Sequence, residues 1–304
     1  MSVVLWKAAS FVLVIIIGYV LKQLHIFKVS DFQIVSRIIM KITLPSVIIT
    51  TFNGIKFESQ LLLIVAFGIV CNLITIGVGW ILARKMSPSE KAFHMINMSG
   101  YNIGCFTFPF IQSMMEPIGT ITCCLFDTGN SLLCTGGTYG IAASVANNGE
   151  RNTFFSFLKK CISSVPLDVY LIMLTLSICH FSLPDTVISL MQPMKEANGF
   201  LAMLMIGIGF ELFLESTQIK QIIKILGIRY GISVLCALLF WFLLPFSESV
   251  RLALVIVLFS PISVVAPIFT QKCQGNVEMS SALNSLSIII SLISITSILL
   301  VAKV

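Results

Sequence analysis

The chain has 304 residues, of which 57% are hydrophobic and only 11% are charged. Soluble domains carry about a quarter of their residues as charged side chains. This composition therefore excludes a soluble protein and predicts an integral membrane protein. The net charge of +6 does not indicate nucleic-acid binding, because the basic residues gather in short loops between apolar segments. We expect the lipid bilayer, and no nucleic acid, as a partner of the chain.

The sequence predicts an all-α polytopic membrane protein with ten transmembrane helices. An apolar run of about 20 residues is long enough to cross the hydrocarbon core of a bilayer as a helix. The sixth and seventh segments have the shortest uncharged cores, so eight or nine spans stay open as alternatives. The expected segments are residues 3–22, 31–53, 60–83, 92–115, 118–146, 164–182, 191–213, 222–245, 250–271 and 279–302.

The loops predict the orientation of these helices. Eleven Lys and Arg residues fall in the loops after odd-numbered helices, and five fall on the opposite side. Because Lys and Arg collect in cytoplasmic loops, we expect the protein in the cytoplasmic (plasma) membrane with both termini outside. Trp6 and Trp241 then lie near the outer interface and Trp80 near the inner one, as aromatic belts require.

The predicted helices divide into two halves. Residues 1–149 are expected to form a first repeat of five helices and residues 164–304 a second one, joined by a cytoplasmic loop at residues 150–163. An odd number of helices in each half makes the halves enter the membrane in opposite directions, as in transporters with inverted repeats.

A sequence spacing supports this inverted repeat. Glu90 precedes Pro109 by nineteen residues, and Glu248 precedes Pro267 by the same interval. Both prolines lie deep in the fourth helix of their half. We therefore expect the fourth and ninth helices to be broken and to cross each other.

Two stretches, Ser99–Phe110 and Phe259–Pro267, carry helix breakers and polar residues where a lipid-facing helix would carry Leu and Val. The backbone groups that a broken helix exposes persist in a membrane only where protein or a water-filled cavity covers them. If the two stretches cross, the positive N-terminal ends of their half-helices point into one cavity, which favours a carboxylate. Two independent kinks are the alternative. The candidate substrate-binding residues here are Asn102, Gly104, Pro109, Ser260, Pro261 and Ser263.

Pro45 is expected to kink the second helix, and Lys41 lies one turn before it. Ten residues from the cytoplasmic end of a helix correspond to a depth of ~15 Å. A lysine near the bilayer centre costs ~3 kcal/mol on insertion scales, so it should face protein or water. Lys41 either attracts the substrate anion or extends to the inner interface beside Arg37. Both residues, Lys41 and Pro45, are candidates for the substrate site.

Asp127 is the acidic candidate, about ten residues into the fifth helix. A buried aspartate can take up and release a proton, and with Asn130 it could instead bind a sodium ion. A third reading makes Asp127 a fixed structural partner of Lys41. We expect proton or sodium coupling at Asp127 and Asn130, and neither a cofactor nor a bound metal beyond that ion.

Two further patterns concern packing and chemistry. Gly136–Gly140 and Gly227–Gly231 each have a GxxxG spacing, which predicts close helix packing. The sequence contains no HExxH, GxSxG or Walker motif. We therefore expect no enzyme.

Three short motifs carry a resemblance to a known family. They are Asn102 with Pro109, Leu44-Pro45, and Ser260-Pro261 followed by Pro267-Ile268-Phe269. The chain resembles the auxin efflux carrier family, which includes bacterial malate-permease-like proteins, within the bile acid/auxin-type transporter superfamily. The resemblance covers essentially the whole chain. It implies a scaffold part, a transport part, and Asn102 as a residue that contacts a carboxylate. The extra proline, Pro267, departs from the family pattern.

These observations predict a permease, that is, a secondary active transporter for a small organic anion such as a dicarboxylate or an auxin-like acid. It would work by alternating access around the two crossing helices. The first alternative is a sodium-coupled bile-acid-type symporter, and a more distant one is a channel or sensor. A homodimer stays open.

Overall fold

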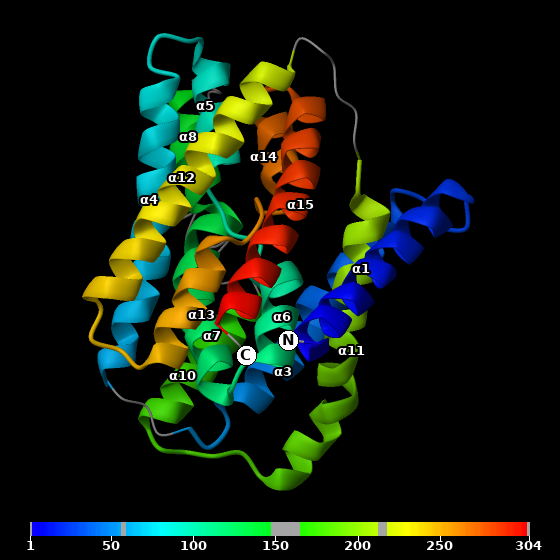
Figure 1. Cartoon of the computed structure of the whole chain (residues 1–304), viewed down its shortest axis with the longest axis vertical. Coiled ribbons are helices and arrows are strands. Elements are labelled where there is room, and N and C mark those ends of the chain that lie inside the picture. The colour runs from blue at the N-terminus through cyan, green and yellow to red at the C-terminus, as the bar shows by residue number, and fades with distance from the viewer. Residues whose placement is uncertain (1, 56–58, 147–164, 212–217, 303–304) are drawn as a thin grey trace.

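The structure is a computed structural model that describes residues 2–55, 59–146, 165–211 and 218–302. These residues form an all-helical protein, with one isolated antiparallel bridge and no β-strand (Figure 1). The predicted connecting loop, residues 150–163, lies outside the described residues. The α-helices are α1 (Ser2–Gln23), α2 (Asp31–Ile38), α3 (Leu44–Phe52), α4 (Leu62–Leu82), α5 (Pro88–Met98), α6 (Phe108–Met114), α7 (Pro117–Leu132), α8 (Thr138–Val145), α10 (Val165–Ile178), α11 (Asp185–Gly209), α12 (Ile219–Leu243), α13 (Glu248–Leu258), α14 (Ala266–Lys272) and α15 (Val277–Val301).

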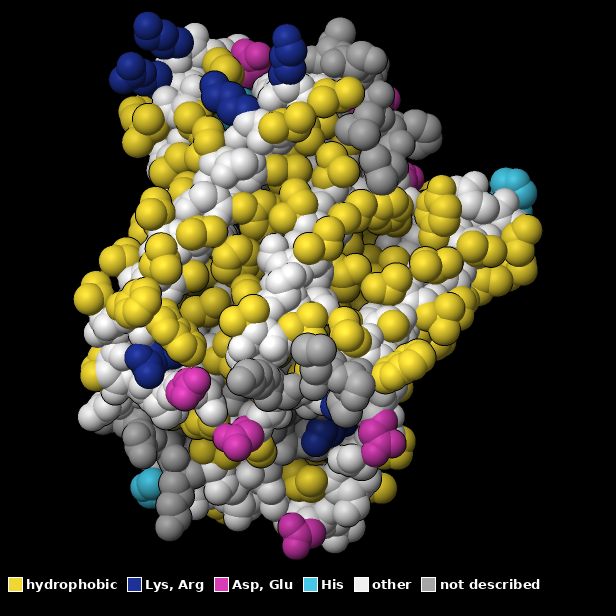
Figure 2. Space-filling view, in the orientation of Figure 1, with side chains coloured by type: hydrophobic (Ala, Val, Ile, Leu, Met, Phe, Trp, Pro, Cys, Tyr) yellow, Lys and Arg dark blue, Asp and Glu magenta, His cyan; other side chains and the backbone are white. Residues whose placement is uncertain are grey.

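Five helical segments are long and apolar enough to cross a membrane, which confirms a polytopic membrane protein. Figure 2 shows the same property on the surface: hydrophobic side chains cover the middle of the visible face. Lys and Arg side chains gather at its upper end, and Asp and Glu side chains are prominent at its lower end. The five segments are Val4–Gln23, Asp31–Phe52, Leu62–Leu82, Ile219–Leu243 and Val277–Val301.

Local sequence explains where α5 begins. The Ser87 side chain accepts a hydrogen bond from the Glu90 N–H, and the Glu90 carboxylate accepts one from the Ser87 N–H at 3.0 Å. This reciprocal pair satisfies two N–H groups that the first turn of a helix leaves free. Pro88 occupies the first helical position, where its missing N–H costs nothing. The helix that leads to the first breaker stretch therefore has a fixed start.

Prolines also explain two π-helical turns. The turn Ile39–Thr43 lies just before Pro45, and the turn Ile103–Thr107 lies just before Pro109. A proline ring clashes with the carbonyl four residues earlier and removes one hydrogen bond. A π turn widens the helix locally and accommodates this loss. Pro267, by contrast, lies in the first turn of α14, where it is tolerated without distortion.

The helices pack in two groups (Figure 1). In the first group, α1 packs along α11, α11 packs against α2 and α3, and α10 packs against α3. In the second group, α4 packs against α5 and α7, α12 against α13, and α14 against α15. α5 also packs against α8, α12 and α14. Both breaker stretches belong to the second group.

Glycines allow the closest helix contacts, but not where the GxxxG spacing predicts them. A Cβ added to Gly207 of α11 would lie 2.1 Å from the Ile15 oxygen of α1. A Cβ on Gly129 of α7 would lie 2.0 Å from the Val65 oxygen of α4. At Gly140, Gly227 and Gly231 an added Cβ meets nothing within 4 Å. The packing predicted at those three glycines is therefore wrong, because their open sides face away from neighbouring helices.

Candidate functional site: a polar cavity at two paired helix interruptions

Two interrupted helices meet inside the second group of helices. The first interruption separates α5 from α6, and the second separates α13 from α14. Their extended segments pair: Tyr101 and Ile262 form an antiparallel bridge, and the Asn102 N–H donates a hydrogen bond to the Pro261 carbonyl at 2.9 Å. The breakers predicted at Ser99–Phe110 and Phe259–Pro267 thus lie at one crossing point and are not independent kinks.

Side chains from α4 and α7 satisfy the backbone of the first interruption. Asn130 donates from Nδ2 to the Tyr101 carbonyl at 2.8 Å and accepts the Tyr101 N–H at 3.1 Å. Asn72 accepts the Gly100 N–H at 2.9 Å. Gly100 has φ +75°, a backbone conformation that favours glycine. These bonds replace the helical ones and allow the extended segment to persist in the membrane.

Side chains from α15 satisfy the backbone groups of the second interruption. The Ser287 hydroxyl accepts the Ile262 N–H at 2.9 Å. Asn284 donates from Nδ2 to the carbonyls of Ile262 at 2.9 Å and Ser263 at 3.2 Å. The helix that follows each interruption along the chain, α7 after α6 and α15 after α14, therefore carries the amide that supports it.

A hydroxyl pair joins the two interruptions directly. Thr107 Oγ1 and Ser260 Oγ lie 2.6 Å apart, and both side chains are fully buried. Ser260 also donates to the Val257 carbonyl at 2.7 Å, in the last turn of α13. Ser260 is thus a structural link of the crossing and does not line the cavity described below.

Arg229 of α12 lies behind the crossing, with 1% of its surface exposed. Its guanidinium donates to the carbonyls of Met98, of Gly100 at 2.7 Å and of Ser260 at 3.4 Å, and it stands over the Tyr101 ring at 5.1 Å. These carbonyls belong to the C-terminal ends of α5 and α13, which carry partial negative charge. One buried cation therefore neutralises the negative ends of both broken helices.

A cavity of about 320 Å³ lies in front of the crossing. One wall comes from the first group of helices through Met40, Leu44 and Pro166. The other wall comes from the two interruptions and from α7 and the turn that follows it. Its residues are Tyr101, Asn102, Ile103, Gly104, Cys105, Asp127, Asn130, Ser131, Cys134, Thr135, Ser263, Val264, Val265 and Phe269. The described lining holds one carboxylate and no Lys, Arg or His.

Asn102 is the most distinctive residue of this lining. It is 5% exposed, and its Nδ2 is buried with no hydrogen-bond partner among the described residues. A buried amide donor without a partner costs free energy, so its presence at a cavity indicates a ligand that accepts its hydrogen bond. The turn that begins at Ile103 and the helix that begins at Ala266 start at this same wall. The N-terminal ends of helices carry partial positive charge, although the N–H groups of Ile103 and Ala266 themselves donate to the Tyr101 and Ser263 carbonyls.

Asp127 is the acidic residue of the described cavity lining. Its Oδ1 accepts a hydrogen bond from Asn130 Nδ2 at 2.8 Å, and its Oδ2 accepts one from the Tyr170 hydroxyl at 3.1 Å. Gly104 allows Leu44 to approach closely, because a Cβ there would lie 2.8 Å from a Leu44 methyl, whereas its 3.6 Å distance to Asp127 Oδ2 would be an ordinary contact. The carboxylate thus has two neutral donors and no cationic partner among the described residues.

The structure brings together half of the residues that the sequence singled out. Asn102, Gly104, Ser263, Asp127 and Asn130 line the cavity. Pro109, Ser260, Pro261 and Pro45 do not line it, and they shape the backbone around it. Lys41 also lies outside the lining, with its side chain exposed on the surface, so the pairing of Lys41 with Asp127 is not observed.

Other residues of the site were missed in the sequence. Ser131 lies one turn after Asp127, and Cys134 and Thr135 follow in the turn after α7. A helical projection continued past the end of α7 could have indicated all three. Arg229 was left without a role, although a lone arginine inside a membrane helix is itself a signal of a buried partner.

The geometry defines an integral membrane protein with a polar cavity at two crossed, broken helices. Residues 3–152, just under half of the chain, match the family described as "Membrane transport protein". The chain is 21% identical over 291 residues, 94% of each chain, to an "Uncharacterized transporter" of Methanothermobacter thermautotrophicus. These similarities support a membrane transporter rather than an enzyme.

Proposed function

We propose that the protein is a secondary active transporter of a small organic anion, of the auxin efflux carrier type. The single observation that carries this proposal is the unpartnered Asn102 amide at the wall of the cavity. A carboxylate oxygen accepts two or more hydrogen bonds and satisfies such a donor. The N-terminal ends of the turn that begins at Ile103 and of α14 carry partial positive charge, which adds favourable electrostatics for a negative charge.

The absence of basic side chains from the described lining is compatible with an anion. Arg229 neutralises the negative ends of α5 and α13, so these ends do not oppose the positive ends of the following half-helices at the cavity. The volume of about 320 Å³ is at the small end of the range for ligand pockets. A small carboxylic acid suits this space better than a large lipid-like anion does.

The ten-helix design with a 5+5 inverted repeat is part of this proposal. In both halves the fourth predicted helix is interrupted, and the following helix carries the asparagine that supports the interruption, Asn130 in one half and Asn284 in the other. These correspondences support the inverted repeat. The difference in charge between the two ends of the molecule in Figure 2 supports the orientation with both termini outside.

The cavity lies where the two groups of helices meet, which supports alternating access. A movement of the crossing and α7 relative to Met40 and Leu44 would open the cavity first to one side of the membrane and then to the other. The first group would act as the scaffold and the second as the moving part.

Reconstitution into liposomes tests the proposal. We expect saturable uptake of at least one acid from a panel of mono- and dicarboxylates, and competition by its close analogues. Uptake of none of them, by protein that keeps its thermal stability in the liposomes, would contradict organic-anion transport. Single-channel currents would point to a channel.

Sodium coupling is the second candidate, and Asp127 favours it. Its carboxylate lines the cavity with Asn130 beside it and has no cationic partner in the described part of the chain. Carboxylate and amide oxygens bind hard cations. Sodium-dependent uptake that is lost in Asp127→Asn supports a sodium symporter, whereas dependence on pH alone supports proton coupling at the same residue.

A further inference from the structure

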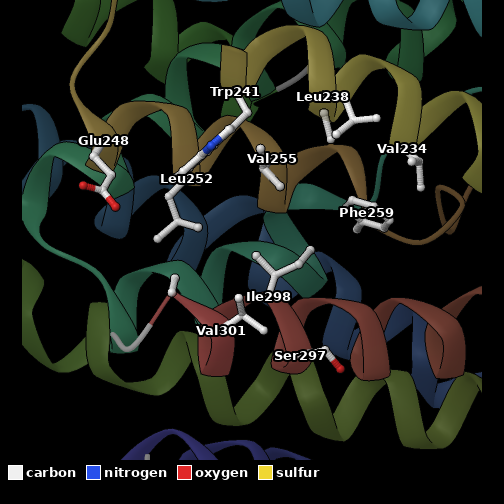
Figure 3. A pocket seen from close by; sticks show the side chains of 12 residues that line it. Val234, Leu238, Trp241, Glu248, Leu252, Val255, Phe259, Ser297, Ile298 and Val301 are labelled. Carbon is white, nitrogen blue, oxygen red and sulfur yellow. The ribbon is translucent and has the colours of Figure 1, made fainter.

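A second cavity, separate from the one at the crossing, opens on the outside of the helix bundle. It has a volume of about 540 Å³ and lies between α12, α13 and α15 (Figure 3). Its walls are almost entirely apolar, with Glu248 and Ser297 as the polar exceptions. The lining consists of Val234, Ala237, Leu238, Trp241, Glu248, Leu252, Val255, Phe259, Ser297, Ile298, Val301 and Ala302. We call this cavity the α12–α15 groove.

The charged residue of the lining, Glu248, lies at one end of the groove, which we call its polar end, whereas Ser297 lies toward the opposite end. Figure 3 shows Glu248 and Trp241 at one end and Val234 and Phe259 at the other. Glu248 and Phe259 are eleven residues apart in or directly after α13, which corresponds to ~16 Å along the helix. This length equals about half of the ~30 Å hydrocarbon core of a bilayer, that is, one leaflet. The tryptophan lies at the end where an interfacial aromatic residue is expected.

The dimensions of the groove suit a hydrocarbon chain. A volume of about 540 Å³ spread over ~16 Å makes a long, narrow groove, and one extended alkyl chain fits this shape. A helix of a second copy is the competing occupant, and the oligomeric state tests it below.

Two charged side chains without charged partners stand at the polar end. Arg251 donates to the Trp241 carbonyl at 2.8 Å and stacks over the Trp241 ring at 5.2 Å, but its Nε is buried with no hydrogen-bond partner in the described part of the chain. Glu248, one turn earlier on α13, is exposed and makes no side-chain hydrogen bond or ion pair to the described residues. An anion would satisfy Arg251, and a cation would satisfy Glu248.

We propose that the α12–α15 groove binds one acyl chain of a zwitterionic phospholipid, whose phosphate contacts Arg251 and whose ammonium group contacts Glu248. The two charged side chains match the charges of the headgroup, and the apolar groove matches the length of one acyl chain. These are separate observations, and a zwitterionic phospholipid satisfies both. The deep end reaches Phe259, directly before Ser260 at the helix crossing. The lipid is therefore in a position to stabilise the segment that carries the second interruption. This inference is independent of which solute is transported.

Native mass spectrometry of the purified full-length protein tests the proposal. The probes are phosphatidylethanolamine and phosphatidylglycerol with identical acyl chains. We expect one tightly bound phosphatidylethanolamine, which Leu238→Trp weakens about tenfold by filling the groove. Leu239→Trp is the matched control, because Leu239 is the adjacent residue, is similarly exposed and does not line the groove. Val234→Trp serves as a second groove-filling variant.

The headgroup is tested separately. Arg251→Gln should weaken both lipids, whereas Glu248→Gln should weaken phosphatidylethanolamine and leave phosphatidylglycerol unchanged. Equal affinity of the wild type for the two lipids, or equal lipid binding by the Leu238→Trp and Leu239→Trp proteins, overturns the proposal. A lipid-free dimer that Leu238→Trp dissociates also overturns it, because a second copy would then occupy the groove.

Discussion

The guanidinium of Arg229 donates a hydrogen bond to the Gly100 carbonyl at 2.7 Å, and it reaches the Ser260 carbonyl at 3.4 Å. One residue of α12 thus connects two helix ends that are 160 residues apart in the chain. The arrangement separates the charges of the crossing: negative helix ends face the arginine, and positive helix ends face the cavity. This separation is the physical basis of the anion site.

Arg229→Met is expected to destabilise the protein. Each buried carbonyl left without its donor costs ~1–3 kcal/mol, and the variant leaves three of them. Arg229→Lys should recover part of the loss, since lysine keeps the charge but lacks the planar fork of donors. The measurement is the thermal unfolding midpoint in detergent. Arg37→Met, at an exposed position, is the control, and equal midpoints for Arg229→Met and Arg37→Met would contradict the role of Arg229.

Asn130→Ala is expected to lower both stability and transport. The variant leaves the Tyr101 N–H without its acceptor. It also removes one of the two donors to the Tyr101 carbonyl and one donor to Asp127. Asn53 is a matched control, because its side chain accepts the Leu183 N–H at 2.7 Å and donates to the Leu183 carbonyl at 3.3 Å. Asn53 does not line the cavity. Asn53→Ala should therefore reduce stability but not the affinity for substrate. A normal affinity in Asn130→Ala would remove this residue from the site.

Thr107 and Ser260 are expected to act as a pair. Thr107→Val and Ser260→Ala each break the 2.6 Å contact, so the double variant should lose less stability than the two single variants together. A hydrogen bond between neutral groups contributes ~0.5–1.5 kcal/mol, which sets the size of the coupling. The unfolding midpoints of the four proteins measure it, and strict additivity would show that the hydroxyl contact does not connect the interruptions.

Gly207→Ala is expected to weaken the contact between α1 and α11. The new Cβ would lie 2.1 Å from the Ile15 oxygen, so the backbones must separate. Overpacking of this kind costs ~1–3 kcal/mol. Gly231→Ala is the control, because its Cβ meets nothing within 4 Å, and alanine favours the helix by ~1 kcal/mol. We expect a lower midpoint for the first variant and an unchanged or higher one for the second; the reverse order would contradict the glycine contact.

The sequence predicted the positions of the two helix interruptions better than the side chains that hydrogen-bond to their backbone. Pro109 and Pro261 remove backbone donors wherever they occur, so interruptions near them follow from local chemistry. Asn102 was identifiable because an amide in an apolar stretch needs a partner. The identity of the supporting groups was not predictable, because Ser287 and Asn284 become supports only through the packing of α15 behind the second interruption.

Lys41 and the GxxxG spacings illustrate the other limit. Depth along a helix can be counted from the sequence, but the direction that a side chain faces depends on which helices become neighbours. Lys41 has the depth of a cavity residue and an exposed position. Gly227 and Gly231 have the spacing of a packing motif and open space around them, whereas Gly207 packs closely without that spacing. Tertiary neighbours decide both cases.

The flux of an organic anion through Asn102→Ala tests the central claim most directly. Wild type, Asn102→Ala and the control Asn53→Ala are compared in liposomes at equal protein content, after thermal unfolding shows that all three are folded. Loss of a hydrogen bond to a charged ligand costs ~1.5–3 kcal/mol, so we predict that Asn102→Ala loses at least about tenfold in saturable uptake while Asn53→Ala retains it. Wild-type uptake by folded Asn102→Ala would contradict binding of the anion at the helix crossing.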